Sequence, residues 1–313
     1  MEIKYIDTHA HLNISVFAED FDVVAQKCVE EGVVVINVGT KESTSKRAVE
    51  LAGQYEHMYA IIGLHPIQTV PGRHDEEETG EGAKPFTSKG ESFNKAFYDE
   101  LAKSNKVVGV GECGFDYYRL SESRVNSGAA SGGVHMTERR KGESSAYWHC
   151  PAETYAVQEE NFIAQIQFAN EHTLPLMIHT RGPKPGEESP TGRSVYADVH
   201  DVLQQYAKVP FNIHFYAGTI AEAEKFFALG GTVSFTGVIT FAKVYEEVVR
   251  ALPLELIHGE TDCPYVAPVP HRGKRAEPWM VQEVYKKIAA IRGENEELVR
   301  LQLLENSRKL YGI

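Results

Sequence analysis

Two histidines near the start of the chain, His9 and His11, have a spacing that suits a metal site. They follow a short apolar run at residues 3–6, which predicts a β-strand. Because alternate side chains of a strand point to the same face, the two imidazoles lie side by side, with Asp7 on the same face. Neutral imidazole nitrogens bind divalent metal ions. On its own this pattern is weak evidence, since the chain contains 13 histidines.

Four further apolar runs end in residue types that bind metals. Residues 107–110 precede Glu112, 174–178 precede His179, 211–213 precede His214, and 254–257 precede Glu260 and Asp262. If these runs are parallel strands of one barrel, their carboxyl ends meet at one face and the side chains converge on the barrel axis. Four imidazoles and two carboxylates are then enough for two divalent ions, or for one well-filled site and a weaker second one. Agreement among five strand ends favours a metal centre over a purely structural role.

The elements that must position these residues alternate in type along the chain. Short β-branched runs predict strands at residues 3–6, 33–38, 59–63, 107–110, 174–178, 211–213, 232–235 and 254–257. Helical spacing of apolar residues predicts helices at 19–31, 44–54, 93–104, 155–172, 195–206, 220–229, 243–251 and 278–292, and a last one at 296–310. This alternation predicts an α/β fold, a single (β/α)₈ TIM barrel. No linker or fixed-period repeat divides the chain, so we expect residues 1–313 to form one domain.

Three segments lengthen the chain beyond such a barrel, which takes about 250 residues. They lie at about residues 71–91, 121–150 and 182–193, and they are rich in Gly, Ser, Pro and charged residues. Each follows a predicted strand, so each belongs to a loop on the barrel face where active sites form. These insertions are either surface decoration or a lid or guide for the substrate.

The composition excludes several classes of protein. With 42% hydrophobic and 24% charged residues, the chain is typical of globular proteins rather than of disordered or fibrous ones. Its apolar runs are far shorter than the ~20 residues of a membrane helix. The N-terminus lacks a signal sequence, so we expect a cytoplasmic protein with no membrane partner. The four cysteines are widely separated, which excludes a cysteine zinc site and fits a reducing compartment.

The formal net charge of −12 argues against a protein that coats nucleic acid. It does not exclude an enzyme that holds the end of a nucleic acid in a small pocket, where bound cations reverse the local sign. A compact basic cluster, Arg272, Lys274 and Arg275, follows the last predicted strand, and Tyr265 and Trp279 are candidates for stacking on bases. Solvation of basic loop residues and ordinary packing of Trp279 are the simpler explanations.

One glycine-rich motif mimics a nucleotide-binding sequence. Residues 109–114 spell Gly-Val-Gly-Glu-Cys-Gly, which matches the dinucleotide fingerprint. However, a polar stretch rather than a helix follows it, and Glu112 would place a negative charge beside a pyrophosphate. The motif also follows the fourth predicted strand instead of the first. We therefore expect no nucleotide cofactor.

Taken together, the motifs resemble those of the TatD-like metal-dependent hydrolases, a family of amidohydrolase-type barrels. The matching stretches are Asp7-x-His9-x-His11, residues 63–66, residues 109–116, His179-x-Arg181, His214, residues 260–265 and residues 306–312. The resemblance covers essentially the whole chain. The chain departs from the family pattern at residues 214–218, at Gly259 and in the three insertions, which leaves the choice of substrate open.

This resemblance implies an activity and a set of metal ligands. The activity is that of a Mg²⁺-dependent deoxyribonuclease that trims DNA from single strands or 3′ ends. The implied ligands are His9, His11, Glu112, His179, His214 and Asp262. We expect two divalent ions per chain, a buried one at His9 and His11 and a more exposed one at His179 and His214.

Catalytic roles follow from the chemistry of a metal-activated water. Glu112 would bridge the two ions, and Asp262 would accept the proton of the attacking water. His65 and Arg181 would contact phosphate oxygens, since a guanidinium binds phosphate with two hydrogen bonds. Alternatively, Arg181 forms a salt bridge. Glu260 and Asp7 would orient the metal ligands or serve as structural hydrogen-bond acceptors.

Metal and substrate remain open at this stage. The resemblance implies Mg²⁺, whereas the imidazole-rich ligand set favours Zn²⁺ or Mn²⁺. The main alternative is a different hydrolase on the same barrel, such as an aminoacyl-tRNA deacylase or an ester or amide hydrolase. A third is a barrel that keeps metal without catalysis, which a complete ligand set disfavours. The sequence does not indicate an oligomeric state.

Overall fold

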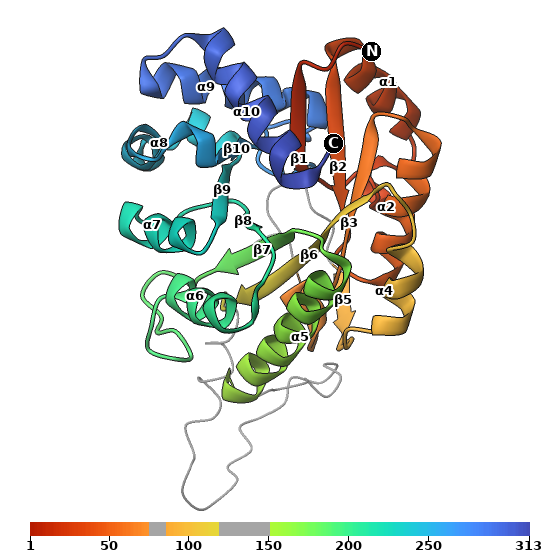
Figure 1. Ribbon diagram of the computed structural model, residues 1–313, viewed down its shortest axis with the longest axis vertical. Coiled ribbons are helices and arrows are strands. Elements are labelled where there is room, and N and C mark those ends of the chain that lie inside the picture. Colours follow the sequence, from red (N-terminus) through yellow and green to blue (C-terminus); the bar gives the residue numbers. More distant parts are fainter. Residues whose placement is uncertain (75–85, 119–150) are drawn as a thin grey trace, which may run out of the picture.

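The computed structural model describes residues 1–74, 86–118 and 151–313, and its centre is a sheet of eight parallel strands (Figure 1). The strands are β1 (Tyr5–Ala10), β2 (Val33–Val38), β3 (Met58–Ile62), β6 (Val107–Asp116), β7 (Leu176–Arg181), β8 (Phe211–Ile213), β9 (Gly231–Phe235) and β10 (Ile257–Gly259). They pair in chain order from β1 to β10. Parallel neighbours bring all the carboxyl ends to one face.

The sheet closes where β10 meets β1. A parallel bridge joins Ala10 to Cys263, just beyond the end of β10. There the amide of His11 donates to the Cys263 carbonyl at 3.0 Å, and the amide of Asp262 donates to the His9 carbonyl at 2.9 Å. The strands therefore form a nearly closed barrel, and the backbone bonds that close it lie beside two predicted metal ligands.

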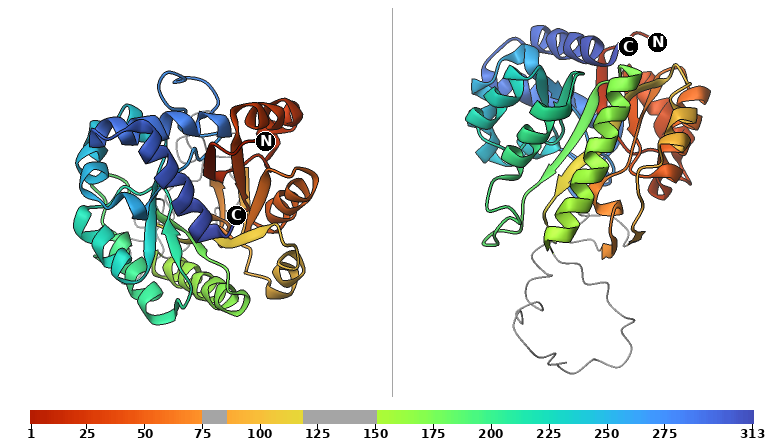
Figure 2. Two further views of the ribbon diagram at one scale, coloured as in Figure 1. Left: turned by 45° about the horizontal axis from the view of Figure 1, so that its top comes forward. Right: turned by 60° about the horizontal axis from the view of Figure 1, so that its bottom comes forward.

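Helices surround the strands, as Figure 2 shows from two sides. They are α1 (Phe21–Glu31), α2 (Glu42–Gln54), α4 (Lys95–Leu101), α5 (Pro151–His172), α6 (Val195–Tyr206), α7 (Ile220–Ala228), α8 (Glu246–Ala251), α9 (Val281–Arg292) and α10 (Glu296–Tyr311). The last of them, α10, packs against β1 and β10 at the end of the barrel where both termini lie (Figure 2). The predicted TIM-barrel fold is confirmed.

Two apolar layers hold this arrangement together. The larger core lies between the strands and the surrounding helices. A smaller cluster fills the barrel interior, where Ile6, Ile36 and Met177 pack with Leu304 and Tyr311 of α10. Because apolar side chains fill the interior from the end near the termini, the polar side chains of the candidate site lie toward the opposite, carboxyl-terminal end.

Several strands run further toward that end than the apolar runs predicted. β1 continues to Ala10, β6 to Asp116 and β7 to Arg181, so the polar residues of these stretches belong to the strands. The last strand was predicted at residues 254–257, which is three residues too early, because Leu254–Leu256 forms a 3-10 turn and β10 begins at Ile257. Predicted and observed helices differ at their ends by a few residues.

The insertions differ in what the structure describes. The first is bounded by an antiparallel pair, β4 (Pro71–His74) and β5 (Phe86–Lys89). The second, residues 121–150, lies outside the described residues. The third, residues 182–193, is tied to α6, because the Thr191 hydroxyl donates to Asp198 at 2.6 Å. Within the described ranges, no helix combines the length and apolarity needed to cross a membrane.

Candidate metal centre

The structure gathers all six predicted metal ligands at the carboxyl-terminal end of the barrel. Glu112 lies at the centre of the group, and its side chain is only 4% exposed. The two oxygens of its carboxylate face different imidazoles. Oε2 lies 3.4 Å from His9 Nε2 and 3.9 Å from His11 Nε2, whereas Oε1 lies 2.7 Å from His179 Nδ1 and 3.3 Å from His214 Nε2. One carboxylate thus joins two sets of ligands.

Asp262 completes the first set. Its Oδ1 lies 3.7 Å from His9 Nε2 and 3.5 Å from His11 Nε2, and the two imidazole nitrogens are 3.1 Å apart. The residue has a left-handed backbone with φ of 56°, a conformation that is uncommon for residues other than glycine. This conformation, together with the hydrogen bond from the Asp262 amide to the His9 carbonyl, turns the carboxylate toward the histidines.

Backbone irregularities in β1 and β6 coincide with the ligands. The pairing of β1 with β2 shifts between Asp7 and Ala10, which spans His9, and that of β6 with β7 shifts between Val110 and Cys113, which spans Glu112. Such shifts redirect side chains and are frequent next to active sites. Gly111 is required here, because its φ is +150° and a Cβ atom would lie 2.4 Å from the Met177 carbonyl oxygen.

Hydrogen bonds at the outer nitrogens of two histidines determine what their inner nitrogens offer. His11 Nδ1 lies 2.9 Å from the Val38 carbonyl, and His214 Nδ1 lies 3.0 Å from Glu260 Oε1. A carbonyl and a carboxylate can only accept, so Nδ1 carries the proton in both rings. Nε2 of each ring then faces the cluster, where its lone pair can bind a metal ion once Nε2 carries no proton.

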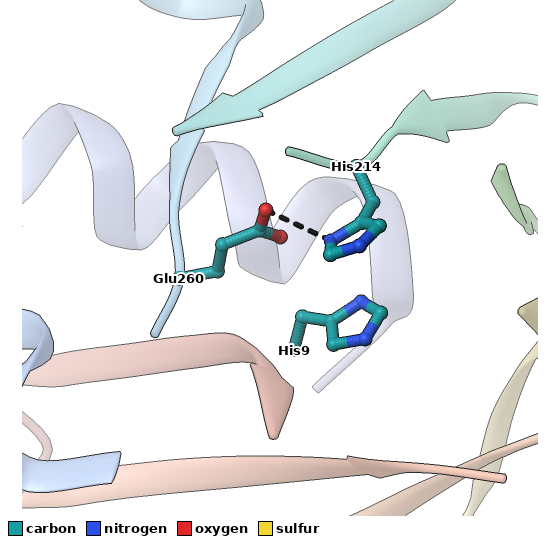
Figure 3. A group of neighbouring side chains, drawn as sticks. All are labelled: His9, His214 and Glu260. Atoms are coloured by element: carbon teal, nitrogen blue, oxygen red, sulfur yellow. Dashed lines mark hydrogen bonds and ion pairs between the residues drawn. The ribbon is translucent and has the colours of Figure 1, made fainter. Parts of the chain in front are cut away.

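Glu260 is fully buried behind His214, as Figure 3 shows. Besides the His214 ring, it accepts the amide of Phe215 at 2.7 Å. His9 lies flat against His214, with ring centroids 3.7 Å apart. The predicted orienting contact of Glu260 with a histidine is therefore present.

Both nitrogens of His179 face carboxylates, as those of His214 do. Nδ1 lies 2.7 Å from Glu112 Oε1, and Nε2 lies 2.9 Å from Asp116 Oδ2. Burial alone lowers the pKa of His179, but these two hydrogen bonds outweigh burial and raise the pKa above its ordinary value. Asp116 thus fixes the ring much as Glu260 fixes His214.

His65 joins the second set with the opposite tautomer. Its Nδ1 accepts the amide of Ile67 at 3.1 Å, so in this ring Nδ1 is the unprotonated nitrogen. Nε2 therefore carries the proton, 3.5 Å from Glu112 Oε1 and 3.2 Å from His179 Nδ1. Burial, followed by repulsion from His179, lowers the pKa of His65 to about 4. His65 is a neutral hydrogen-bond donor at the edge of the cluster.

The carboxylates of the cluster favour a positive charge, either a proton or a cation, among the imidazole rings. Burial acts to raise the pKa of Glu112, yet the surrounding histidines hold it well below its usual range. Burial likewise acts to lower the pKa of His214, yet Glu260 and Glu112 raise it well above its usual range. The carboxylates thus draw protons onto the imidazoles, and a divalent cation can take the place of those protons. The nitrogen and oxygen donors present therefore fit a metal ion.

Several sets of three residues bring their donor atoms within 4.8 Å of one another. Two of them are His9, His11 and Glu112, and Glu112, His179 and His214. The remaining sets are His65, Asp116 and His179, and His9, His214 and Glu260. The cluster opens into a cavity of about 1370 Å³, whose lining includes His65, Glu112 and Asp262.

Comparison with known proteins agrees with this geometry. The model of the TatD related DNase family matches residues 6–312. The chain belongs to this family. It is 28% identical over 312 residues to an uncharacterized metal-dependent hydrolase of Bacillus subtilis, YabD, with 98% of each chain covered. It is 25% identical over 314 residues to a second uncharacterized metal-dependent hydrolase, YcfH of Escherichia coli K12, covering 98% of this chain and 96% of that one.

Solved structures confirm the fold of this TatD-family chain. The TatD homologue YjjV of Escherichia coli superposes with a TM-score of 0.72 at 22% identity, covering 100% of both chains. A TatD-family hydrolase of Entamoeba histolytica gives a TM-score of 0.70 at 20% identity, covering 99% of both chains. The chain is thus a TatD-family metal-dependent hydrolase with several clusters able to hold metal ions.

Other predicted site residues of this TatD-family chain have more varied surroundings. Arg181 lines the cavity, with its guanidinium 3.8 Å from the centre of the Tyr118 ring. Among the described residues, the Asp7 carboxylate forms no hydrogen bond to an imidazole ring. Its carboxylate accepts the amide of Thr261 at 2.8 Å, the Thr261 hydroxyl at 2.6 Å and the amide of His9 at 3.3 Å, which joins β1 to the segment before Asp262.

The basic cluster is only partly available for a ligand. Arg275 pairs with Asp20 at 2.6 Å and with Glu277 at 3.0 Å, and the Trp279 indole donates to Glu277 at 2.6 Å. Arg275 is therefore held by ion pairs rather than only solvated, whereas Trp279 packs against the core, as the simpler explanation predicted for it. Tyr265 lines the main cavity beside Asp262.

Asp116 is the orienting residue that the sequence interpretation left without a role. Its position was readable, because Glu112 and Asp116 are four residues apart on one strand and so share a face. Reading the strand as residues 107–110 hid this relation. In β6, which extends to Asp116, both carboxylates belong to one continuous strand.

Proposed function

We propose that this TatD-family chain hydrolyses phosphodiester bonds of DNA, at single strands or 3′ ends, with two divalent cations. His9, His11, Glu112 and Asp262 would hold one cation, and Glu112, His179 and His214 the other. The observation that carries the proposal is the position of the Glu112 carboxylate, whose two oxygens face two separate sets of imidazoles at 2.7–3.9 Å. Paired cations in this arrangement are characteristic of phosphoryl-transfer sites.

Bound cations would acidify water and neutralise the charge of the phosphate. The residues of the chain supply the remaining steps. Asp262 is the acceptor for the proton of the attacking water. Burial acts to raise the pKa of Asp262, but the histidines around it outweigh burial and lower the pKa below its ordinary value. The carboxylate is thus ionised and available as a base.

His65 and Arg181 would both contact the phosphate, His65 as a neutral donor and Arg181 as a charged one. His65 supplies a neutral N–H, which can donate to a phosphoryl oxygen without adding charge. Arg181 supplies a guanidinium that lines the same cavity. Glu260 and Asp116 would hold the rings of His214 and His179 so that one nitrogen of each faces the cations.

Mg²⁺ is the cation implied by the family likeness, whereas the imidazole-rich donor set favours Mn²⁺ or Zn²⁺. A second candidate function is hydrolysis of an ester or amide, including an aminoacyl-tRNA ester, on the same centre. It is supported by the net charge of −12, which disfavours a long anionic substrate.

A substrate panel separates the two. Metal-stripped protein is given Mg²⁺, Mn²⁺ or Zn²⁺ with single-stranded DNA, a small phosphodiester, an aminoacyl-tRNA and a simple ester. We expect DNA shortening that depends on added metal and is lost in Asp262→Asn but kept in Asp201→Asn, an exposed control. Intact DNA together with ester cleavage would establish the second function instead.

A further inference from the structure

A second hollow of about 360 Å³ lies beside the active-site cavity. Val16 and Val266 line both, so the two spaces are neighbours. Asp262 and Tyr265 face the main cavity, whereas Pro264 faces the hollow. Four residues of extended chain span at most about 14 Å, so the hollow begins within that distance of the Asp262 backbone.

The hollow is a built site held by contacts between two loops. The amide of Val269 donates to the Thr240 hydroxyl at 2.9 Å. Gly237 allows the loops to touch, because a Cβ atom there would lie 2.4 Å from the Val266 carbonyl oxygen. The guanidinium of Arg272 lies 4.1 Å from the centre of the Phe241 ring. Its walls therefore keep their shape without a ligand.

The lining combines an aromatic ring with positive charge. Phe241 is 43% exposed, so part of its ring is open to a ligand. Arg272, Lys274 and Arg275 bring cationic groups to the lining, and Arg275 pairs with Asp20 and Glu277. In a chain with a net charge of −12, this pairing of an exposed ring and cations beside the catalytic cavity fits an anionic, base-bearing ligand.

We propose that the hollow is a nucleotide subsite, which takes a base against Phe241 and a backbone phosphate against Lys274, a few nucleotides from the bond that is cleaved. This inference rests on the proposed function and deepens it, because it assigns a binding place to a part of the DNA strand away from the bond that is cleaved. Stacking against an exposed ring tolerates any base, so the subsite recognises a strand without reading its sequence.

Equilibrium binding tests the subsite independently of cleavage. A fluorescent ~10-nucleotide DNA strand and a dinucleotide are titrated into metal-stripped protein and followed by anisotropy. The variants are Phe241→Ala and Lys274→Gln, and the matched control is Lys243→Gln, an exposed lysine near Phe241 that does not line the hollow.

We expect Phe241→Ala to weaken binding of the longer strand by roughly 5- to 100-fold. Lys274→Gln should reduce the slope of log affinity against log salt by about 0.7, the value for one phosphate contact on a single strand. The dinucleotide should bind equally to all forms. Unchanged thermal melting of both variants shows that the fold is intact.

Two results would overturn the subsite. One is equal affinity and equal salt slope for the longer strand in the wild type and both variants, and the other is an effect of Lys243→Gln as large as that of Lys274→Gln. Failure of the proposed function gives a different pattern, in which the metal-loaded wild type leaves both DNA and a small phosphodiester intact. A protein that cleaves the small phosphodiester and shows no effect of Phe241→Ala on the longer strand has the activity without the subsite.

Discussion

Replacing Glu260 by glutamine tests whether a buried carboxylate prepares His214 for metal binding. Oε1 of Glu260 receives the His214 ring nitrogen at 3.0 Å and the Phe215 amide at 2.7 Å. In Glu260→Gln the amide oxygen can keep both bonds, but it no longer carries the charge that makes the ring a stronger ligand. Loss of such a partner typically weakens metal affinity 10–100-fold, or about 1.4–2.8 kcal/mol.

Stability should fall as well, for a separate reason. Among the described residues, buried Oε2 of Glu260 has no hydrogen-bond partner of normal geometry, although Ser234 lies near this carboxylate, and in the variant an amide nitrogen with two protons would occupy this position. An unsatisfied buried donor costs about 1–3 kcal/mol. The metal-free variant should therefore unfold at a lower urea concentration than the metal-free wild type.

Calorimetric titration with Mn²⁺, together with urea unfolding of the metal-free protein, measures both effects. Asp198→Asn is a matched control, since Asp198 is a buried carboxylate that binds Tyr117 at 2.9 Å and lies outside the cluster. We expect it to lower stability and leave metal affinity unchanged. If Glu260→Gln bound metal with wild-type affinity, or if both variants weakened it equally, the orienting role of Glu260 would be refuted.

Two further predictions concern His65 and the buried His258. His65 carries its proton on Nε2, so ¹⁵N-detected NMR of the metal-free protein should show the Nε2–H form at neutral pH, and an Nδ1–H spectrum would contradict this. His65→Ala should lower kcat by about 10²–10³. His65→Gln keeps a hydrogen-bond donor and should therefore retain more activity than His65→Ala. Burial lowers the pKa of His258 to about 4 from 6.5, so the unfolded state binds the extra proton between these values and stability should fall by about 3 kcal/mol as pH decreases through that window. His258→Asn should remove this part of the slope in urea unfolding measured against pH, and an unaltered slope would assign the acid sensitivity to other groups.

The order of strands and helices could be predicted because apolar content dominates the barrel. Residues 33–38 are apolar except for one asparagine, and the predicted bounds match β2. The strand ends were harder to predict, since at the barrel mouth polar side chains replace apolar ones while the backbone pairing continues. For this reason the first strand was expected to end at Ile6, although β1 extends through His9 to Ala10.

The membership of the site was also predictable, because all six expected ligands stand at strand ends. Their partners were not, since a hydrogen bond between distant segments leaves no trace in spacing. Nothing in the sequence connects Glu260 to His214 rather than to another histidine, or indicates that Arg275 pairs with Asp20.

The distinction between a metal ligand and a hydrogen-bond donor depends on the same kind of contact. His11, His214 and His65 all end apolar strands and all face Glu112, so sequence patterns treat them alike. The atom behind each ring separates them. Nδ1 of His11 donates a hydrogen bond to a carbonyl and Nδ1 of His214 donates one to a carboxylate, so in both rings Nε2 is the nitrogen that can bind a metal ion. Nδ1 of His65 instead accepts a hydrogen bond from the Ile67 amide, so its Nε2 carries the proton and faces inward as an N–H donor. A centre that must bind both cations and a phosphate needs both kinds of group, and the chain obtains them from one residue type by changing what the backbone and Glu260 present to the far nitrogen.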